Sequence, residues 1–216
     1  MQTNQEKLEI TLKEYAKNLS YLAELQSNDT FSNSSAETKA IAIAAIFKYA
    51  KGEVRIFAGN LEGAVSNNAG YLQALNSLLE RGVRLKLLLE YLPDKKTEAF
   101  NIILSNAELF PNQTQIRKIS SKSIPIIKTN NNLTHFVIGD YTMVQIDQDV
   151  LSYKGIVTFN NPEFANKLIH SFDRAFEQAD QVGSTIPIQK NPNLDSEYLK
   201  QIINVITKIK AKEPDQ

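Results

Sequence analysis

The chain has 216 residues, of which 42% are hydrophobic and 22% charged, and this size and composition are typical of a globular protein with one substantial core. It contains no cysteine, which excludes a disulfide framework, a thiolate nucleophile and a cysteine metal site. Its 24 basic and 24 acidic residues cancel, and this neutrality argues against nucleic acid as the main ligand, because proteins that bind the phosphate backbone usually carry a basic excess.

The first 35 residues contain a predicted helix and a polar connection. The opening, MQTNQEKLEI, lacks the apolar core of a secretory signal, and no apolar run approaches the roughly 20 residues that cross a bilayer, so we expect a cytoplasmic protein without a membrane span. Apolar residues recur mostly every three or four positions over 5–27, which predicts an amphipathic helix. The stretch 28–35 is typical of a turn, and the spacing of Ser34 and Glu37 predicts a capping box for the next helix.

The middle of the chain alternates between predicted helices and strands. Strands are predicted at 53–58, 83–90 and 115–119, and helices at 37–51, 68–81 and 94–107. Gly82 follows the second helix, where a residue in the left-handed conformation commonly ends a helix. Residues 120–132 are rich in Ser, Lys and Asn, which predicts a mobile loop.

Three more strands and two more helices are expected in the rest of the chain. The strands are predicted at 133–139, 142–146 and 155–160. Asn161 and Pro162 begin a long helix that reaches about residue 180, with proline near the first helical position. A polar linker at 183–194 precedes a last amphipathic helix at 195–211.

This order of elements indicates an α/β fold. Strand–helix–strand units followed by a meander predict a mixed sheet with helices on both faces. The first and last helices lie outside this pattern, and because both have apolar faces they must pack on something. We therefore divide the chain into an N-terminal helix and linker at 1–34, an α/β domain at 35–182, and a linker and C-terminal helix at 183–216.

Several segments resemble the phospholipase D-like family, in the order in which that family has them. The segment YLQALNSLLERGVRLKLLL resembles the family's helix, RGV turn and apolar strand. The segment LTHFVIGDYTMVQI resembles its catalytic strand and hairpin, and GIVTFNNPEFANKLIHSFDRAFEQA resembles its final strand and helix. The resemblance covers about residues 40–180 and implies a phospholipase D-like mixed sheet flanked by helices, here with extra N-terminal and C-terminal helices.

Most of the catalytic motif of that family has no counterpart in this sequence. Family members carry H-x-K-x4-D and a G-S-x-x-N loop, whose His attacks phosphorus while Lys and Asn stabilise charge on the phosphoryl oxygens. When the family's Asp is aligned on Asp140, Leu133 takes the position of the nucleophile and His135 that of the Lys. The segment 147–154 (DQDVLSYK) has no G-S-x-x-N loop. A shift that makes His135 the nucleophile puts Val137 at the Lys position and loses the match at Asp140.

Three residues are nonetheless candidates for a site. His135 is a candidate nucleophile or ligand-binding residue, and the alternative is an imidazole held in place on a strand. Asp140 is a candidate catalytic acid, or a turn residue that bonds local backbone groups. Asn60 follows a strand, where loops of α/β folds often bind ligands, or it is a polar turn residue. We expect neither a metal nor a cofactor, because no ligand spacing or Gly-rich phosphate loop is present.

These features predict a non-catalytic regulatory or interaction module that keeps the phospholipase D-like scaffold without its chemistry. The resemblance further implies an accessory subunit of a bacterial multi-component system, of the kind linked to defence against mobile elements. The alternatives are a homodimeric phosphodiesterase or nuclease that uses His135 from each chain, and a protein whose terminal helices form an interface. We expect a homodimer with a further protein partner and little affinity for nucleic acid.

Overall fold

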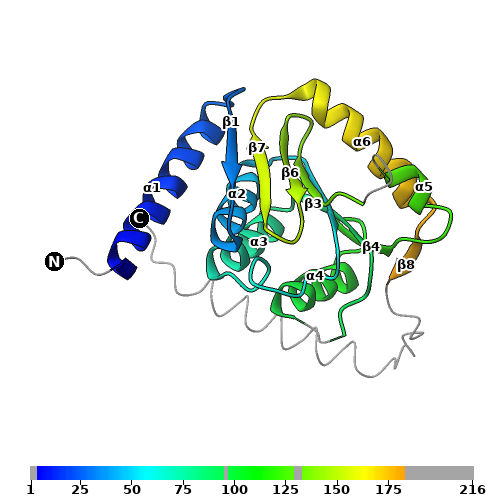
Figure 1. The fold of residues 1–216 in the computed structure, drawn as a ribbon. Helices are drawn as coiled ribbons and strands as arrows, with labels where there is room; N and C mark the ends of the chain where they lie inside the picture. Colours follow the sequence, from blue (N-terminus) through cyan, green and yellow to red (C-terminus); the bar gives the residue numbers. More distant parts are fainter. Residues whose placement is uncertain (1–3, 95–96, 129–132, 183–216) are drawn as a thin grey trace, which may run out of the picture. The chain divides into compact units, whose positions relative to one another are not determined.

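The computed structural model describes residues 4–94, 97–128 and 133–182, which form an eight-stranded sheet with helices on both faces (Figure 1). The strand order across the sheet is β1-β7-β6-β5-β2-β3-β4-β8. The strands are β1 (Thr30–Asn33), β2 (Glu53–Ala58), β3 (Arg84–Leu89), β4 (Thr114–Lys118), β5 (Phe136–Gly139), β6 (Met143–Asp149), β7 (Lys154–Thr158) and β8 (Asp180–Val182). The helices are α1 (Asn4–Glu24), α2 (Ala36–Tyr49), α3 (Ala69–Glu80), α4 (Glu98–Leu109), α5 (Ile124–Ile127) and α6 (Pro162–Glu177). The prediction of a mixed α/β sheet is therefore confirmed.

The sheet has a parallel part and an antiparallel part. β2, β3 and β4 run parallel and are connected through α3 and α4. β5, β6 and β7 form an antiparallel meander, and β5 pairs antiparallel with β2. Parallel neighbours need a long crossover, whereas antiparallel neighbours can be joined by tight turns. The spacing of the elements along the sequence follows from this difference.

Both faces of the sheet are covered by apolar side chains. Val54 and Ile56 of β2 join a core cluster with residues of α2, α3 and α4, whereas Phe57 joins a second cluster with residues of α5 and α6. On β5, Val137 belongs to the first cluster and Phe136 to the second. Side chains alternate between the faces of a strand, and a sheet that is buried on both faces therefore has nearly continuous apolar strands. This explains the three consecutive buried leucines, Leu87–Leu89, at the end of β3.

The helix predicted over 5–27 is confirmed as α1, which packs against α2. Leu19 and Ala23 are buried in the core, and the Tyr15 hydroxyl donates a hydrogen bond to the Ser32 carbonyl oxygen at 3.1 Å. Burial raises the pKa of Tyr15 to about 12, so this donor keeps its proton at physiological pH. Four apolar side chains of the N-terminal segment remain exposed, namely Leu8, Ile10, Tyr21 and Leu25.

Three short elements depart from the sequence predictions. The turn predicted over 28–35 is wrong in part, because β1 lies within it and pairs antiparallel with β7 at the sheet edge. The loop predicted over 120–132 is wrong for the residues of α5, where Ile127 is buried in the cluster shared with α6. β8 is a strand that the sequence did not predict, and it pairs antiparallel with β4. Each element is stabilised by a neighbour that is distant in sequence, and local polarity does not reveal such neighbours.

The helix ends follow local signals, with one shift. Gly82 after α3 has φ +75°, and the Asn161 side chain caps α6 by accepting from the Phe164 N–H at 3.1 Å, as predicted. The capping box predicted at Ser34 is wrong by one residue. Ser35 and Thr38 make both bonds of the capping box: the Thr38 N–H donates to Ser35 Oγ at 3.2 Å, and the Ser35 N–H donates to Thr38 Oγ1 at 3.0 Å.

Two further predictions concern the C-terminal part of the sequence. The linker at 183–194 and the helix at 195–211 lie outside the described residues. They stay predictions, as does the division of the chain at residue 183.

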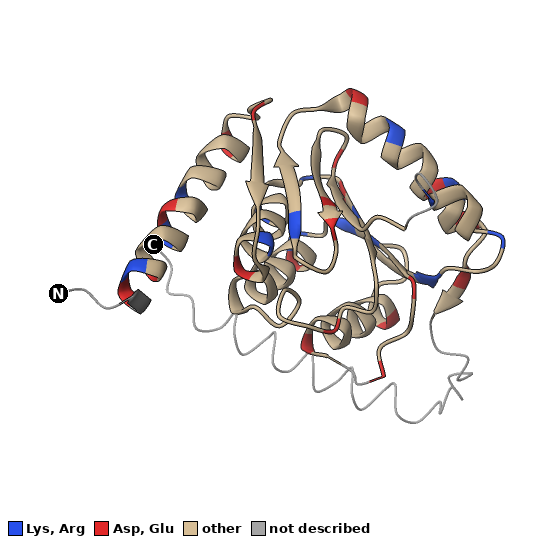
Figure 2. Cartoon of the chain, viewed as in Figure 1, with Lys and Arg blue, Asp and Glu red and all other residues tan. Residues whose placement is uncertain are grey.

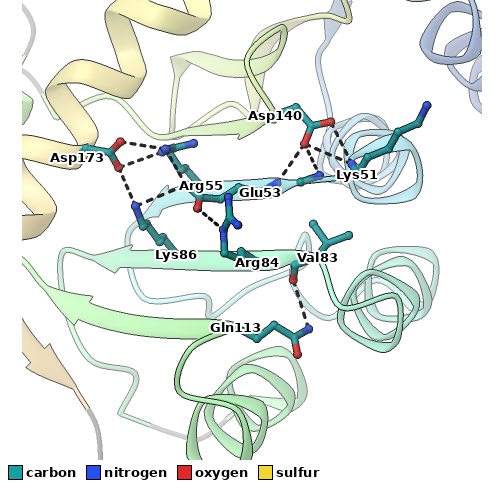
Figure 3. A network of polar contacts seen from close by, with 10 residues as sticks. Lys51, Glu53, Arg55, Val83, Arg84, Lys86, Gln113, Asp140 and Asp173 are labelled. Atoms are coloured by element: carbon teal, nitrogen blue, oxygen red, sulfur yellow. Dashed lines mark hydrogen bonds and ion pairs between the residues drawn. The ribbon is translucent and has the colours of Figure 1, made fainter.

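A network of ion pairs fastens α6 to the sheet (Figure 3). Asp173 of α6 accepts hydrogen bonds from Arg55 Nε and Nη2 at 3.0 and 2.9 Å, and Lys86 Nζ lies 3.3 Å from the same carboxylate. The Glu53 carboxylate lies 2.6 Å from Arg55 Nη2 and 2.9 Å from Arg84 Nε. Burial raises the pKa of Asp173, but the hydrogen bonds and charges of Arg55 and Lys86 outweigh it and hold that pKa below its ordinary value.

Candidate functional site

His135 immediately precedes β5 and lies beside the carboxyl ends of the central strands β2 and β3. Its carbonyl oxygen accepts a hydrogen bond from the Asp147 N–H at 2.9 Å, so pairing with β6 fixes its backbone. Its ring stands edge-on to Phe57, with a centroid distance of 5.5 Å. Ligands of open α/β sheets bind outside the carboxyl ends of the strands. The topology thus places His135 where this class of fold commonly binds ligands.

Both ring nitrogens of His135 face carboxylates. Nε2 lies 2.5 Å from Oε1 of Glu90, the residue that follows β3, and Nδ1 lies 3.9 Å from Oδ2 of Asp147. An ionised carboxylate can only accept hydrogen bonds, so Nε2 is the donor in its contact with Glu90. A ring nitrogen that carries a proton has no free lone pair with which to attack a substrate.

The Asp147 carboxylate is completely buried and is paired with a lysine. Lys39 Nζ, from α2, lies 2.6 Å from Asp147 Oδ2, and the side chains are 12% and 0% exposed respectively. Gln145 Nε2 donates to Asp147 Oδ1 at 3.0 Å. A buried carboxylate is tolerated only when it is paired and hydrogen-bonded. Because Asp147 already neutralises Lys39, this lysine is not an unpaired cation.

A cavity of about 250 Å³ adjoins His135. Polar side chains from separate elements line it, namely Lys39 of α2, Asn60, Glu62 and Ser66 of the β2–α3 loop, Tyr71 of α3, His135, Gln145 of β6 and Tyr153 of the β6–β7 turn. Its apolar walls come from α2, β2 and β5 and include Ile43, Ile56 and Val137. A concave, largely apolar site with a few convergent polar groups is typical of small-molecule sites.

Asn60 lies at the same cavity as His135, within a turn of its own. Its Oδ1 accepts from the Glu62 N–H at 3.0 Å, and its Nδ2 donates to Glu62 Oε2 at 2.9 Å. This is the local side-chain-to-backbone bonding that Asn makes in turns. The structure therefore brings two of the three candidate residues together, with the amide of Asn60 engaged by its own loop.

Asp140 does not join this cavity, because it lies at the other end of β5. Its carboxylate accepts hydrogen bonds from the backbone N–H groups of Lys51, Gly52 and Glu53, at 3.0, 2.7 and 3.1 Å (Figure 3). Its φ of +53° lies in the left-handed region. These contacts join the β5–β6 turn to the connection between α2 and β2.

The other positions of the family motif lack the side chains that act on a phosphate in the family. Leu133, aligned with the family's nucleophile, packs against the apolar cluster shared with α6, and an alkyl side chain cannot attack phosphorus. Residues 147–154 form the end of β6, a turn and the first residue of β7. Among the described residues, no three His, Cys, Asp or Glu side chains are grouped so that they could hold a metal ion.

In the part of the chain that the structure describes, we find no helix with the length and apolar character needed to cross a bilayer.

Sequence reasoning did not identify Lys39, Glu90 or Asp147 as neighbours of His135. One signal was available, because Gln145 and Asp147 alternate with the apolar residues of β6 and therefore point to one face. The same alternation is typical of a strand with one solvated face, so it did not distinguish a polar cluster from ordinary exposure. Lys39 lies in an Ala-rich helix and Glu90 follows a strand, and no sequence motif marks either residue as part of a site.

The comparisons with known proteins show the fold. Neither a protein-family model nor a curated protein sequence matches the chain. Among solved structures, NucT from Helicobacter pylori matches with 13% identity over 72% of this chain and 99% of that chain, at a TM-score of 0.51. Nuc from Salmonella typhimurium, a phospholipase D family member, matches with 13% identity over 72% of this chain and 97% of that chain, at a TM-score of 0.50.

A third match is TrmBL2, an archaeal chromatin protein with a novel mode of DNA binding. It is 16% identical over 82% of this chain, at a TM-score of 0.52, and this chain spans 65% of its length. Similarity at these identities shows the fold alone. The protein therefore has a phospholipase D-like α/β fold, as the order of its sequence segments predicted.

Proposed function

We propose that this protein is a non-catalytic regulatory or interaction module, which uses the phospholipase D-like scaffold to bind rather than to cleave phosphodiesters. The observation that carries the proposal is the contact of 2.5 Å between His135 Nε2 and Glu90 Oε1. A catalytic His in this fold must present an unprotonated nitrogen to phosphorus. Here Nε2 donates to Glu90, and the remaining nitrogen faces Asp147 at 3.9 Å.

The charges around His135 support the same conclusion. A phosphodiester is an anion, and its cleavage develops further negative charge that the site must stabilise. Glu90 and Asp147 both lie beside the ring, and Lys39 is already paired with Asp147. Two like charges about 4 Å apart repel each other by about 4 kcal/mol at the effective dielectric constant of a protein surface. A phosphate placed here would meet carboxylates instead of the Lys and Asn of the family.

The distribution of charge supports weak affinity for nucleic acid. The formal net charge is zero, and basic and acidic residues are interspersed over the described elements (Figure 2). Affinity for DNA depends mainly on the number of phosphates that a protein neutralises. We therefore do not extend the DNA binding of TrmBL2 to this chain. We propose instead that its partner is a protein. On the family resemblance alone, we further propose that the chain is an accessory subunit of a bacterial, defence-type assembly in the cytoplasm.

The experiment is a cleavage assay on the full chain. We expect no release of nitrophenol from bis(4-nitrophenyl) phosphate and no nicking of plasmid DNA above buffer, with or without divalent cations. One missing charge-stabilising donor typically lowers the rate about 10²–10³-fold, and this chain lacks both the Lys and the Asn of the family motif. His135→Ala tests the site, and His170→Ala, an exposed histidine of α6, is the matched control. Cleavage that His135→Ala abolishes and His170→Ala keeps would overturn the proposal.

The alternative is a homodimeric phosphodiesterase or nuclease with His135 from each chain. It is favoured by one observation, the cavity beside His135 at the carboxyl ends of the strands, in a fold shared with Nuc. In that case Glu90 would suppress the nucleophile, and Glu90→Gln would increase cleavage several-fold. Under the proposed function Glu90→Gln leaves the rate at background.

A further inference from the structure

We infer that the cavity beside His135 binds a small uncharged ring compound that carries hydroxyl or amide groups, with Tyr71 as its buried hydrogen-bonding anchor. The inference rests on the proposed function, because it assigns binding and not phosphodiester chemistry to this site. Three observations support it: the surroundings of the Tyr71 hydroxyl, the pairing of the charged side chains at the cavity, and the apolar walls of the cavity.

Tyr71 is buried and lines the cavity, yet the described residues offer its hydroxyl no hydrogen bond. The residue is 2% exposed, and its ring stands edge-on to Phe47 with a centroid distance of 5.1 Å. Burial raises the pKa of Tyr71, so the hydroxyl remains a donor and an acceptor. Within residues 4–94, 97–128 and 133–182, no group forms a hydrogen bond with it. The hydroxyl oxygen itself is not completely buried, so water can reach it, and a polar ligand group in the cavity could replace that water.

Other hydrogen-bonding groups converge on the same space. Gln145 is 1% exposed, and its Nε2 is held by Asp147 at 3.0 Å. This contact fixes the amide and leaves its carbonyl oxygen as an acceptor. Asn60 and Tyr153 line the cavity from two different loops. A ligand with several polar groups could therefore bond to more than one element of the fold.

The charges at the cavity favour an uncharged ligand. Lys39 is paired with Asp147 at 2.6 Å, and His135 is bonded to Glu90 at 2.5 Å. An anion would find no surplus cation in this cluster and would be repelled by the carboxylates. A cation would have to compete with Lys39 for the buried Asp147 carboxylate, and with Asn60 Nδ2, at 2.9 Å, for the Glu62 carboxylate that also lines the cavity.

The walls and volume favour a compact ring. Ile43, Ile56 and Val137 form apolar surfaces, against which the face of a ring can pack while its edge reaches the polar groups. The volume of about 250 Å³ lies just below the range of roughly 300–1,000 Å³ that is usual for small-molecule pockets. A single ring with a few substituents fits this space, and a longer ligand would extend out of it.

The test uses the full chain and three probes. These are myo-inositol, an uncharged cyclic polyol; nicotinamide, an uncharged aromatic amide; and inorganic phosphate. Saturation-transfer NMR detects binding, and titration gives the dissociation constant. We expect binding of at least one uncharged probe and none of phosphate. Tyr71→Phe removes only the hydroxyl and should weaken binding about three- to tenfold. Tyr21→Phe, on the exposed surface of α1, is the matched control and should bind like the native chain.

Stability distinguishes a binding role from a structural one. Because none of the residues that the structure describes bonds to the hydroxyl, Tyr71→Phe should leave the melting temperature of the free protein unchanged or slightly higher. The inference is overturned if neither uncharged probe binds, if Tyr71→Phe binds equally well, or if phosphate binds in preference. If no uncharged probe binds and no cleavage is detected, only this inference is refuted. Cleavage that depends on His135 would refute the proposed function.

Discussion

His135 and Asp140 flank the same short strand, and their surroundings differ completely. His135 meets the side chains of Phe57, Glu90 and Asp147, whereas Asp140 meets three consecutive backbone N–H groups. Aspartate tolerates the left-handed conformation better than most residues, because its side chain can bond nearby backbone groups. The contacts of Asp140 therefore agree with a turn residue, and those of His135 agree with a binding residue held in one orientation.

The first prediction concerns the three bonds of Asp140. Asp140→Ala should lower the free energy of unfolding by about 1–3 kcal/mol, because it leaves the N–H groups of Lys51, Gly52 and Glu53 without this acceptor. Asp140→Asn should cost less, because the amide oxygen still accepts. Urea denaturation measures both, and Asp94→Ala, in an exposed loop, is the control. If Asp140→Ala matches the control, the turn is held by other contacts.

At the scale of the elements, α6 combines an apolar side and a charged anchor. Phe172 and Phe176 are buried and stack on each other at a centroid distance of 5.5 Å. Asp173 lies between them in sequence and pairs with Arg55 and Lys86 on the strands below (Figure 3). The apolar contacts supply most of the attachment, and the ion pairs fix the rotation of the helix because they have a defined direction.

The second prediction is a pH dependence that belongs to this anchor. The pKa of Asp173 is lowered in the fold, so its contribution to stability is fully present above the ordinary aspartate value of about 3.9 and is lost as the pH falls through the lower folded value. Asp173→Asn should therefore cost about 1–2 kcal/mol at pH 7, between exposed and buried ion pairs. The difference from the native chain should shrink below pH 4.

Denaturation of both chains from pH 7 to pH 2.5 measures this effect. Glu163→Gln is the matched control, since Glu163 pairs with Lys167 on the exposed side of the same helix at 2.8 Å. It should behave like the native chain at neutral pH. A difference between Asp173→Asn and the native chain that stays constant down to pH 2.5 would show that the carboxylate charge does not matter.

The sequence predicted the longer elements, because their signals are local. α3 has its apolar spacing and Gly82, α6 has Asn161 and Pro162, and β2 and β3 are rich in apolar residues. β1 and β8 have four and three residues and exist through pairing with β7 and β4. Such pairings join distant parts of the chain, so composition alone cannot reveal them.

The same reason limits what the sequence tells about the site. The sequence predicted His135 within a strand and Asn60 after one; His135 in fact immediately precedes β5, and the structure brings both residues to one cavity. The pairing of His135 with Glu90, 45 residues away, depends on β3 lying two strands from β5 in the sheet. Whether the His135 ring is free to act as a nucleophile depends on that contact, and no sequence motif predicts it.

At the scale of the whole molecule, packing within the chain accounts for only some of the apolar side chains of α1. Leu19 is buried and Leu22 packs against the core, so part of the apolar pattern folds back onto the chain. Ile10 and Tyr21 are 43% and 61% exposed, and they lie eleven residues apart, which is close to three helical turns and places them on one side. An exposed apolar side of a helix is typical of an interaction surface.

The last prediction is that the protein is a homodimer and that α1 contributes to the contact. Light scattering at tens of micromolar should give twice the chain mass of 24.3 kDa. Tyr21→Lys should weaken the dimer about tenfold or more, because a charge would replace an aromatic anchor. Leu109→Lys, at a position 72% exposed on α4, is the control and should remain dimeric. A chain ending at residue 183 should also remain dimeric. A monomeric full-length chain would refute the prediction, and a monomer found only after truncation would move the contact to the C-terminal residues.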